Sequence, residues 1–141
     1  MTKQDYAGDL KPTECWQLLA KEKNSFLIDC RTNAEWQFVG IPDLESLNKK
    51  TVLIEWQTYP SMSLNNNFAQ EIKDFGIKKE DKLILICRSG GRSRSAAEFL
   101  SSLGYESCYN CATGFEGEHN LIGQRSNESG WKFSKLPWKQ G

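Results

Sequence analysis

Residues 83–93 read LILICRSGGRS, and this stretch decides both the expected fold class and the place where chemistry is expected. It opens with a short, uninterrupted apolar run, which is typical of a strand buried on both faces of a parallel sheet. Cys87 ends this run, and a Gly-Gly pair separates it from apolar residues that recur at helical spacing. The stretch therefore predicts a buried strand, a tight loop and a helix in immediate succession.

The rest of the chain repeats this alternation of buried strands and helical patterns. Asn67 and Gln70 occupy the positions of an N-terminal helix cap, and Gly76 and Gly104 those of C-terminal caps. Helices that alternate with buried strands predict an α/β fold, with a mostly parallel central sheet and helices on both faces. The expected strands are residues 26–28, 52–54, 83–86 and, with a weaker pattern, 106–111. The expected helices are a short one that begins at Pro12 and precedes the polar residues 21–24, and those over residues 67–76 and 93–104.

Length and composition exclude several classes of protein. The 141 residues predict a single domain over 1–141, in which residues 113–141 have no clear period and form an irregular C-terminal cover. Eighteen Lys and Arg residues balance eighteen Asp and Glu residues, so no overall charge favours nucleic acid or an anionic membrane. No apolar run approaches the ~20 residues that span a bilayer, and the N-terminus lacks the pattern of a signal peptide. Without a secretion signal a disulfide framework is not expected, so we expect the five cysteines to be free thiols in a cytoplasmic protein.

The loop after the central strand combines residues that suit an anion-binding nucleophile. Gly90 and Gly91 can adopt positive φ, so that several backbone N–H groups point at one spot where a helix begins. Cys87 is expected beneath these donors, which favour its anionic thiolate form. Arg88 and Arg92 add guanidinium groups of the kind that bind oxyanions.

This loop also concentrates positive charge. Residues 82–97 contain four basic side chains, those of Lys82, Arg88, Arg92 and Arg94, and no acidic one. Taken singly, a cysteine that ends a strand is usually a small packing residue, and a Gly-Gly pair often only turns the chain. Their combination with flanking arginines favours an activated nucleophile in a locally basic site.

The same residues resemble the rhodanese family. Residues 87–93 are similar to its active-site loop, C-R-S-G-x-R-S, and residues 27–31 are similar to its early strand signature, which Glu35 completes. Residues 114–117 resemble the segment after the last strand of the family, and residues 130–138 resemble the ending of its bacterial single-domain members. The resemblance covers about the whole chain, and the loop is its most specific part.

What this resemblance implies is a rhodanese-like fold and a sulfurtransferase that needs no metal or organic cofactor. In such an enzyme Cys87 accepts a sulfane sulfur from thiosulfate or a similar small anionic donor and becomes a persulfide, which cyanide, a thiol or a protein acceptor discharges. The expected site residues are the catalytic Cys87 and, for binding the anion, Arg88, Ser89, Gly90, Gly91, Arg92 and Ser93. One departure is VGIPDL at residues 39–44, where many members have Gly-His-Ile-Pro-Gly-Ala; it touches none of these site residues.

The length of the loop separates two kinds of chemistry. From Cys87 to Arg92 the pattern is C-x4-R, whereas phosphatases with a cysteine nucleophile use C-x5-R. The resemblance implies that, within this fold, the shorter loop goes with sulfur transfer and the longer loop with phosphatase or arsenate reductase activity. Two alternatives stay open: a persulfide-carrying or protein-binding module with little turnover of small donors and, less favoured, a phosphatase or arsenate reductase.

Three charged residues near the first predicted strand are expected to be scaffold rather than site. Thr32 and Glu35 have the spacing of a capping box, so Glu35 is expected to start a short helix. Asp29 and Arg31 are two residues apart where a strand ends and point to the same face, so a partly buried ion pair between them can brace the edge of the sheet.

The other four cysteines favour packing over chemistry. Cys108 and Cys111 are three apart on a strand and face opposite sides of the sheet, so they suit neither a metal nor a disulfide. Cys30 ends a strand at the same edge as Cys87; a resolving role stays open, but a buried packing thiol is favoured. Cys15 has no charged pattern that would activate it.

Two further groups of residues complete the candidates. His119 is the single histidine, and one histidine cannot build a zinc site with these cysteines. Trp36, Trp56 and Phe115 belong either to the wall of the pocket or to the core, and their pattern does not decide between the two.

Overall fold

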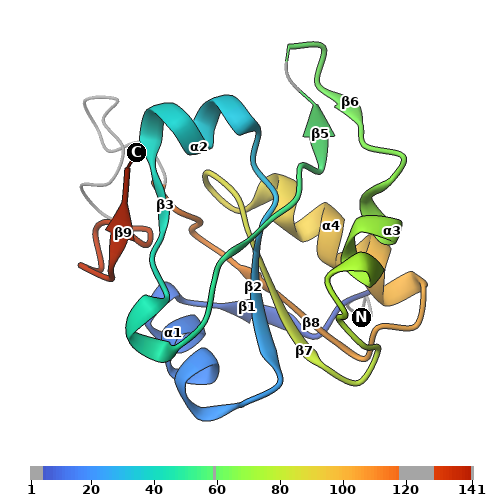
Figure 1. The fold of residues 1–141 in the computed structure, drawn as a ribbon, viewed down its shortest axis with the longest axis horizontal. Coiled ribbons are helices and arrows are strands. Elements are labelled where there is room, and N and C mark those ends of the chain that lie inside the picture. Colours follow the sequence, from blue (N-terminus) through green and yellow to red (C-terminus); the bar gives the residue numbers. More distant parts are fainter. Residues whose placement is uncertain (1–4, 59, 118–128, 141) are drawn as a thin grey trace, which may run out of the picture.

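The computed structural model describes residues 5–58, 60–117 and 129–140. Its centre is a five-stranded sheet in the order β1-β8-β7-β2-β4, in which every neighbouring pair is parallel (Figure 1). The predicted α/β fold with a mostly parallel central sheet is therefore confirmed. The strands are β1 (Gly8–Leu10), β2 (Ser25–Asp29), β4 (Val52–Leu53), β7 (Lys82–Ile86) and β8 (Ser107–Cys111); the helices are α1 (Pro12–Lys21), α2 (Asn33–Val39), α3 (Phe68–Asp74), α4 (Gly91–Ser102) and the 3-10 helix η1 (Glu45–Leu47).

Side chains of the central strand alternate between the two faces of the sheet. Leu83 and Leu85 pack with residues of α3 and α4, whereas Ile84 and Ile86 pack with residues of α1 and with Trp131. These four strand side chains and Trp131 are completely buried. Because helices cover both faces, the central strand requires apolar residues at all four of these buried positions.

The edges of the sheet differ from the expectation more than its centre does. Residues 52–54 contribute β4, which is an edge strand and ends at Leu53. The opposite edge is β1, whose three residues have no apolar period that would predict a strand. Pairing of residues 8–10 with residues 109–111 of β8 forms this strand instead.

One helix boundary agrees with the expectation and one differs. α1 begins at Pro12, in the first turn where proline is tolerated, and ends at Lys21, the first residue of the polar stretch. α4 begins at Gly91, two residues before the expected start at Ser93, because Gly90 adopts φ 109° and forms the N-cap.

The start of α3 is capped differently from the prediction. Asn67 is the N-cap residue, but its side chain makes no capping hydrogen bond. The side chain of Asn65 accepts the N–H of Asn67 at 3.0 Å instead, and Gln70 donates to Asp74 further along the helix. Gly76 follows the helix end with φ 78°, as the sequence predicts.

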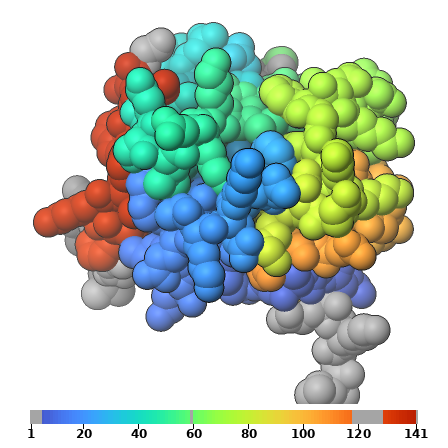
Figure 2. Space-filling view, turned by 60° about the horizontal axis from the view of Figure 1, so that its bottom comes forward, coloured from blue at the N-terminus to red at the C-terminus, as the bar shows by residue number. Residues whose placement is uncertain are grey.

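The expected irregular C-terminal cover includes one short strand. β9 (Trp138–Lys139) pairs antiparallel with β3 (Ile41–Pro42), and in Figure 2 the red C-terminal residues lie beside this green segment. Trp131 is completely buried, and its Nε1 donates to the carbonyl oxygen of Pro137 at 2.7 Å. Residues 118–128, which include His119, lie outside the described residues.

A second antiparallel pair, β5 (Gln57–Thr58) and β6 (Ser63–Leu64), forms a hairpin ahead of α3. In the part of the chain that the structure describes, no helix has the length and apolar character needed to cross a membrane.

Candidate active site

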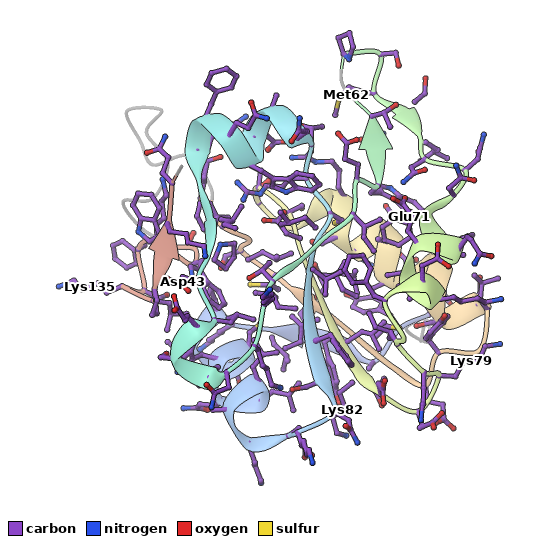
Figure 3. The ribbon with its side chains drawn as sticks, in the orientation of Figure 1. Asp43, Met62, Glu71, Lys79, Lys82 and Lys135 are labelled. Carbon is purple, nitrogen blue, oxygen red and sulfur yellow. The ribbon has the colours of Figure 1, made fainter. Side chains whose placement is uncertain are left out.

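Cys87 lies directly after β7, at the carboxyl end of the central strand, and the loop that it opens leads into α4 (Figure 1). Lys82, the first residue of β7, lies at the other end of the strand (Figure 3). At ~3.3 Å per residue the two are about 16 Å apart along the strand. Lys82 therefore does not contribute to the charge around Cys87, which corrects the expected basic cluster.

The sulfur of Cys87 accepts two hydrogen bonds inside the loop. The N–H of Gly90 and the hydroxyl of Ser93 each lie 3.2 Å from Sγ. Cys87 is only 1% exposed, so little water competes with these donors. The N–H groups in the first turn of α4 have no acceptor within the helix, as at every helix start. This arrangement can bind an anion at or just above Sγ.

The two glycines of the loop have different roles. Gly90 has φ 109°, a conformation that favours glycine, and a Cβ there would overlap the carbonyl oxygen of Ala112. Gly91 does not adopt a positive φ and has open space where a Cβ would lie. Only Gly90 is therefore required by the shape of the loop.

Both terminal nitrogens of Arg92 are bound by one carboxylate, that of Glu35. Its Nη1 and Nη2 donate to Oε1 and Oε2 of Glu35 at 2.6 and 2.9 Å, and both side chains are about one-fifth exposed. Glu35 also forms the predicted capping box with Thr32 at the start of α2. Burial alone would raise the pKa of Glu35, but the hydrogen bonds and charge of Arg92 outweigh it and lower that pKa below its usual value. Arg92 thus joins the loop to α2, a contact for which the sequence has no local signal.

The remaining arginines of the expected basic cluster also have acidic partners. Nε of Arg88 lies 3.2 Å from Glu116, and Arg88 is about half exposed. Nε of Arg94 lies 3.7 Å from Glu98 one turn further along α4. The expected excess of positive charge is therefore offset by carboxylates, two of which come from distant parts of the chain.

Backbone pairing holds the start of the loop in place. The N–H of Phe115 donates to the carbonyl oxygen of Cys87 at 2.8 Å, and the N–H of Glu116 donates to that of Arg88 at 3.0 Å. Gly114 approaches the same backbone so closely that a Cβ would lie 2.6 Å from the carbonyl oxygens of Cys87 and Arg88. Ser89 is half-buried.

The predicted ion pair of Asp29 and Arg31 is confirmed, and it is fully rather than partly buried. Nη2 of Arg31 donates to Asp29 at 2.7 Å and to the carbonyl oxygen of Gly40 at 2.6 Å. The guanidinium lies over the ring of Phe115, 4.3 Å from its centroid. Both residues therefore brace the end of β2 and tie it to the segments that follow α2 and β8.

Cys30 and Cys87 follow neighbouring strands and belong to the same buried cluster. The thiol of Cys30 donates to the carbonyl oxygen of Ile86 at 3.4 Å. Burial raises the pKa of Cys30 well above its usual value, and the proximity of Cys87 and of Asp29 raises it further. Cys30 therefore stays a protonated packing thiol at neutral pH.

The other cysteines are free, buried thiols. Cys108 and Cys111 belong to the clusters on opposite faces of the sheet, as predicted. Burial raises the pKa of Cys108 to about 11. A hydrogen bond with Cys111 and burial together raise the pKa of Cys15 far above its usual range.

The aromatic candidates divide between core and surface. Phe115 is completely buried under Arg31 and belongs to the core. Trp56 packs edge-on against Phe68, with ring centroids 5.1 Å apart, and also contacts Phe99. Trp36 is half-buried on α2, and its Nε1 has no hydrogen-bond partner among the described residues.

Two polar residues that the sequence did not single out, Asn110 in β8 and Asp9 in β1, are linked to the site by hydrogen bonds. The Ser93 hydroxyl, which contacts Cys87, also bonds to Oδ1 of Asn110 in β8. Nδ2 of Asn110 donates to Asp9 in β1. The available signal was an asparagine inside an otherwise buried strand, which requires a partner.

Within residues 5–58, 60–117 and 129–140, no three His, Cys, Asp or Glu side chains come together as metal ligands would.

Comparison with known proteins relates this chain and its fold to a family. The family described as STR4 middle domain matches residues 9–141. The uncharacterized protein RC0915 of Rickettsia conorii is 38% identical over 127 residues, which cover 90% of this chain and 93% of that protein. Rhodanese-like domain-containing protein 4 of Arabidopsis thaliana is 27% identical over 120 residues, which cover 85% of this chain and 23% of that protein.

Two solved structures share the architecture. The crystal structure of Rv0390 from M. tuberculosis has a TM-score of 0.87 at 40% identity, over 96% of this chain and 99% of that one. The polysulfide-sulfur transferase homodimer from Wolinella succinogenes has a TM-score of 0.64 at 19% identity, over 97% and 80% of the two chains, which shows the fold alone. Since the family match spans nearly the whole chain, this protein belongs to the family of the STR4 middle domain and has its rhodanese-like fold.

Proposed function

We propose that the protein is a sulfurtransferase that moves a sulfane sulfur from thiosulfate, or a similar small anion, to a thiophilic acceptor through a persulfide on Cys87. The observation that carries this proposal is the environment of Sγ. Sγ of Cys87 lies at the carboxyl end of the central strand, accepts hydrogen bonds from Gly90 and Ser93, and faces the start of a 12-residue helix. Such a site favours both a thiolate nucleophile and an anion bound above it.

The first step forms the persulfide. The thiolate of Cys87 attacks the outer sulfur of thiosulfate; a new S–S bond forms, the old one breaks, and its electron pair leaves with sulfite. The N–H groups of residues 89–93 bind the anion, and the half-exposed Arg88 attracts it at the rim. Arg92 contributes positive charge from a fixed position, because Glu35 binds both of its terminal nitrogens.

The second step returns the enzyme to its resting state. Cyanide or a thiolate attacks the outer sulfur of the persulfide, and Cys87 leaves as a thiolate. The cycle is ping-pong, as covalent catalysis predicts. The backbone N–H groups that favour a negative charge on the attacking thiolate also stabilise the anionic outer sulfur of the intermediate.

Loop length favours this chemistry over phosphate transfer. Four residues separate Cys87 from Arg92, one fewer than in the phosphatase pattern. A phosphatase also needs an acid to protonate the departing oxygen, whereas sulfite leaves without one.

Intact-mass spectrometry after treatment with thiosulfate tests the proposal. We expect a gain of the mass of one sulfur atom, its removal by cyanide, and no gain in Cys87→Ser. Cys30→Ser is the matched control: it lies beside the site in the same cluster and should still take up sulfur. No adduct on the native protein would overturn the proposal. A stable adduct that cyanide and thiols fail to remove would identify a sulfur carrier instead, and hydrolysis of an aryl phosphate that depends on Cys87 would identify a phosphatase.

A further inference from the structure

The hydroxyl of Ser93 lies between two acceptors. Its Oγ is 3.2 Å from Sγ of Cys87 and 2.5 Å from Oδ1 of Asn110. All three residues are buried, so no bulk water can supply a missing partner. A hydroxyl carries one proton and can donate to only one of these atoms at a time.

The side chain of Asn110 is fixed with its oxygen toward Ser93. Its Nδ2 donates to Oδ1 of Asp9 at 3.1 Å, and a carboxylate can only accept. Asp9 lies opposite Asn110 in the parallel pairing of β1 with β8 (Figure 1), and the hydroxyl of Tyr6 donates to the same oxygen of Asp9 at 2.7 Å. A flipped amide would place an N–H donor toward Ser93 and an oxygen against a carboxylate. The carboxylate of Asp9 therefore ensures that the Ser93 hydroxyl faces the amide oxygen of Asn110 and not its amide nitrogen.

The preferred direction of the Ser93 proton depends on the state of the sulfur. When Cys87 is a thiol, its S–H can donate to Oγ while Ser93 donates to Asn110. When Cys87 is a thiolate, the hydroxyl must rotate toward Sγ, which leaves Oδ1 of Asn110 buried without a donor, at a cost in free energy. In the persulfide, Sγ is bonded to two heavy atoms and carries neither proton nor charge, so the hydroxyl returns to Asn110.

We propose that Asn110, oriented by Asp9, is a positioning residue that competes with Cys87 for the Ser93 hydroxyl and thereby disfavours the thiolate relative to the thiol and the persulfide. The persulfide part of this inference rests on the proposed function. In sulfur release, the acceptor thiolate attacks the outer sulfur, the S–S bond breaks, and its electron pair goes to Sγ; the hydroxyl then rotates to that charge and no proton is transferred. Asn110 opposes this last rotation and so lengthens the time for which the sulfur stays on Cys87.

Alkylation of Cys87 by iodoacetamide at pH 7, followed by peptide mass spectrometry, tests the competition without any sulfur chemistry. Asn110→Leu keeps a similar volume and removes the acceptor, so the hydroxyl is free for Sγ and alkylation should be roughly two- to tenfold faster, the worth of one hydrogen bond. Ser93→Ala removes the donor and should slow alkylation by a similar factor. The pH profile of alkylation should move to lower pH in Asn110→Leu and to higher pH in Ser93→Ala.

A merely structural role predicts a different result. Loosened packing would change both variants in the same direction, and this outcome would overturn the proposal. Ser25→Ala removes a buried hydroxyl at the opposite end of β2 and should leave the rate unchanged. If Asn110→Leu does not fold, Asp9→Ala on the exposed edge strand frees the Asn110 amide to flip, and it should accelerate alkylation less strongly but in the same direction.

Sulfur loading separates this inference from the proposed function. With thiosulfate-loaded protein and a low-molecular-weight thiol, Asn110→Leu should lose its persulfide faster than the native protein. If Asn110→Leu and Ser93→Ala change the alkylation rate in opposite directions but the native protein takes up no sulfur, the competition for the hydroxyl stands and the proposed sulfur transfer is overturned. If the native protein takes up sulfur but both variants change the alkylation rate in the same direction, the sulfur transfer stands and the role of Asn110 is overturned.

Discussion

Glu35 contributes to two elements at once. It closes the capping box at the start of α2 and binds both terminal nitrogens of Arg92 in the loop. Because the two side chains are about four-fifths buried, loss of the carboxylate leaves a guanidinium with little water to replace its partner. At the residue scale, this pair is the main polar link between the loop that carries Cys87 and the helix that follows β2.

Glu35→Gln should lower the free energy of unfolding at pH 7 by roughly 1–3 kcal/mol, the cost of an unsatisfied buried polar group. It should also change the dependence on pH. Because folding lowers the pKa of Glu35, its contribution is present above the pKa of the unfolded chain, about 4.3, and is lost as the pH falls through the lower folded value. Urea unfolding between pH 7 and pH 3 checks both expectations.

Glu98→Gln is the control for this prediction, because it removes an exposed ion pair on α4. Such pairs contribute about 0.2–1 kcal/mol, so the change should be small. If the two variants lose the same stability and keep the same acid sensitivity as the native protein, the Glu35–Arg92 pair does not hold the loop.

At the scale of elements, the turn from β7 into α4 depends on one glycine of the pair. Gly90→Ala places a methyl group against the carbonyl oxygen of Ala112 in a conformation that disfavours alanine. We expect it to destabilise the protein by roughly 1–3 kcal/mol and, because the N–H of residue 90 moves away from Sγ, to reduce sulfur loading at least tenfold. Thermal unfolding and the rate of sulfur uptake measure the two effects.

Gly91→Ala is the matched substitution one residue later. Its methyl group enters open space at the first position of a helix, so the free energy of unfolding should stay the same or rise by up to about 1 kcal/mol. Equal destabilisation by both substitutions would contradict the assignment of the strained turn to Gly90 alone.

The elements that the sequence predicts are those with a local signal. Continuous apolar runs mark β2 and β7, and helical spacing marks α4, because burial on both faces of the sheet or on one face of a helix imposes a period. The strands β1, β3 and β9 have two or three residues each and form only by pairing with segments far along the chain. For the same reason the partners of Asn110 could not be predicted: its place in a buried strand indicates that it needs partners, but Ser93 and Asp9 lie on two other elements.

At the scale of the whole molecule, charge is the property that the sequence predicts least well. Counting along residues 82–97 indicates a basic site, but Lys82 lies at the far end of β7. The three arginines each meet a carboxylate, and all three carboxylates, those of Glu35, Glu98 and Glu116, lie outside the counted stretch. Folding therefore turns a stretch rich in positive charge into a site of paired charges within a neutral chain.

This pairing predicts a weak dependence of sulfur loading on salt. A neutral protein whose site arginines are paired exerts little long-range attraction on thiosulfate, whereas steering by a net field can accelerate association tenfold or more at low ionic strength. We expect the second-order rate constant for persulfide formation to fall by less than about threefold between 20 and 300 mM salt.

Glu116→Gln leaves Arg88 without its acidic partner at the half-exposed rim, so it should raise the rate at low salt and make the rate fall more steeply as salt is added. A steep fall in the native protein, unchanged by this substitution, would mean that the arginines attract the anion over a long range despite their partners. The expected result would leave anion binding to short-range contacts, those of the backbone donors of the loop and the start of α4 and that of Arg88 at the rim.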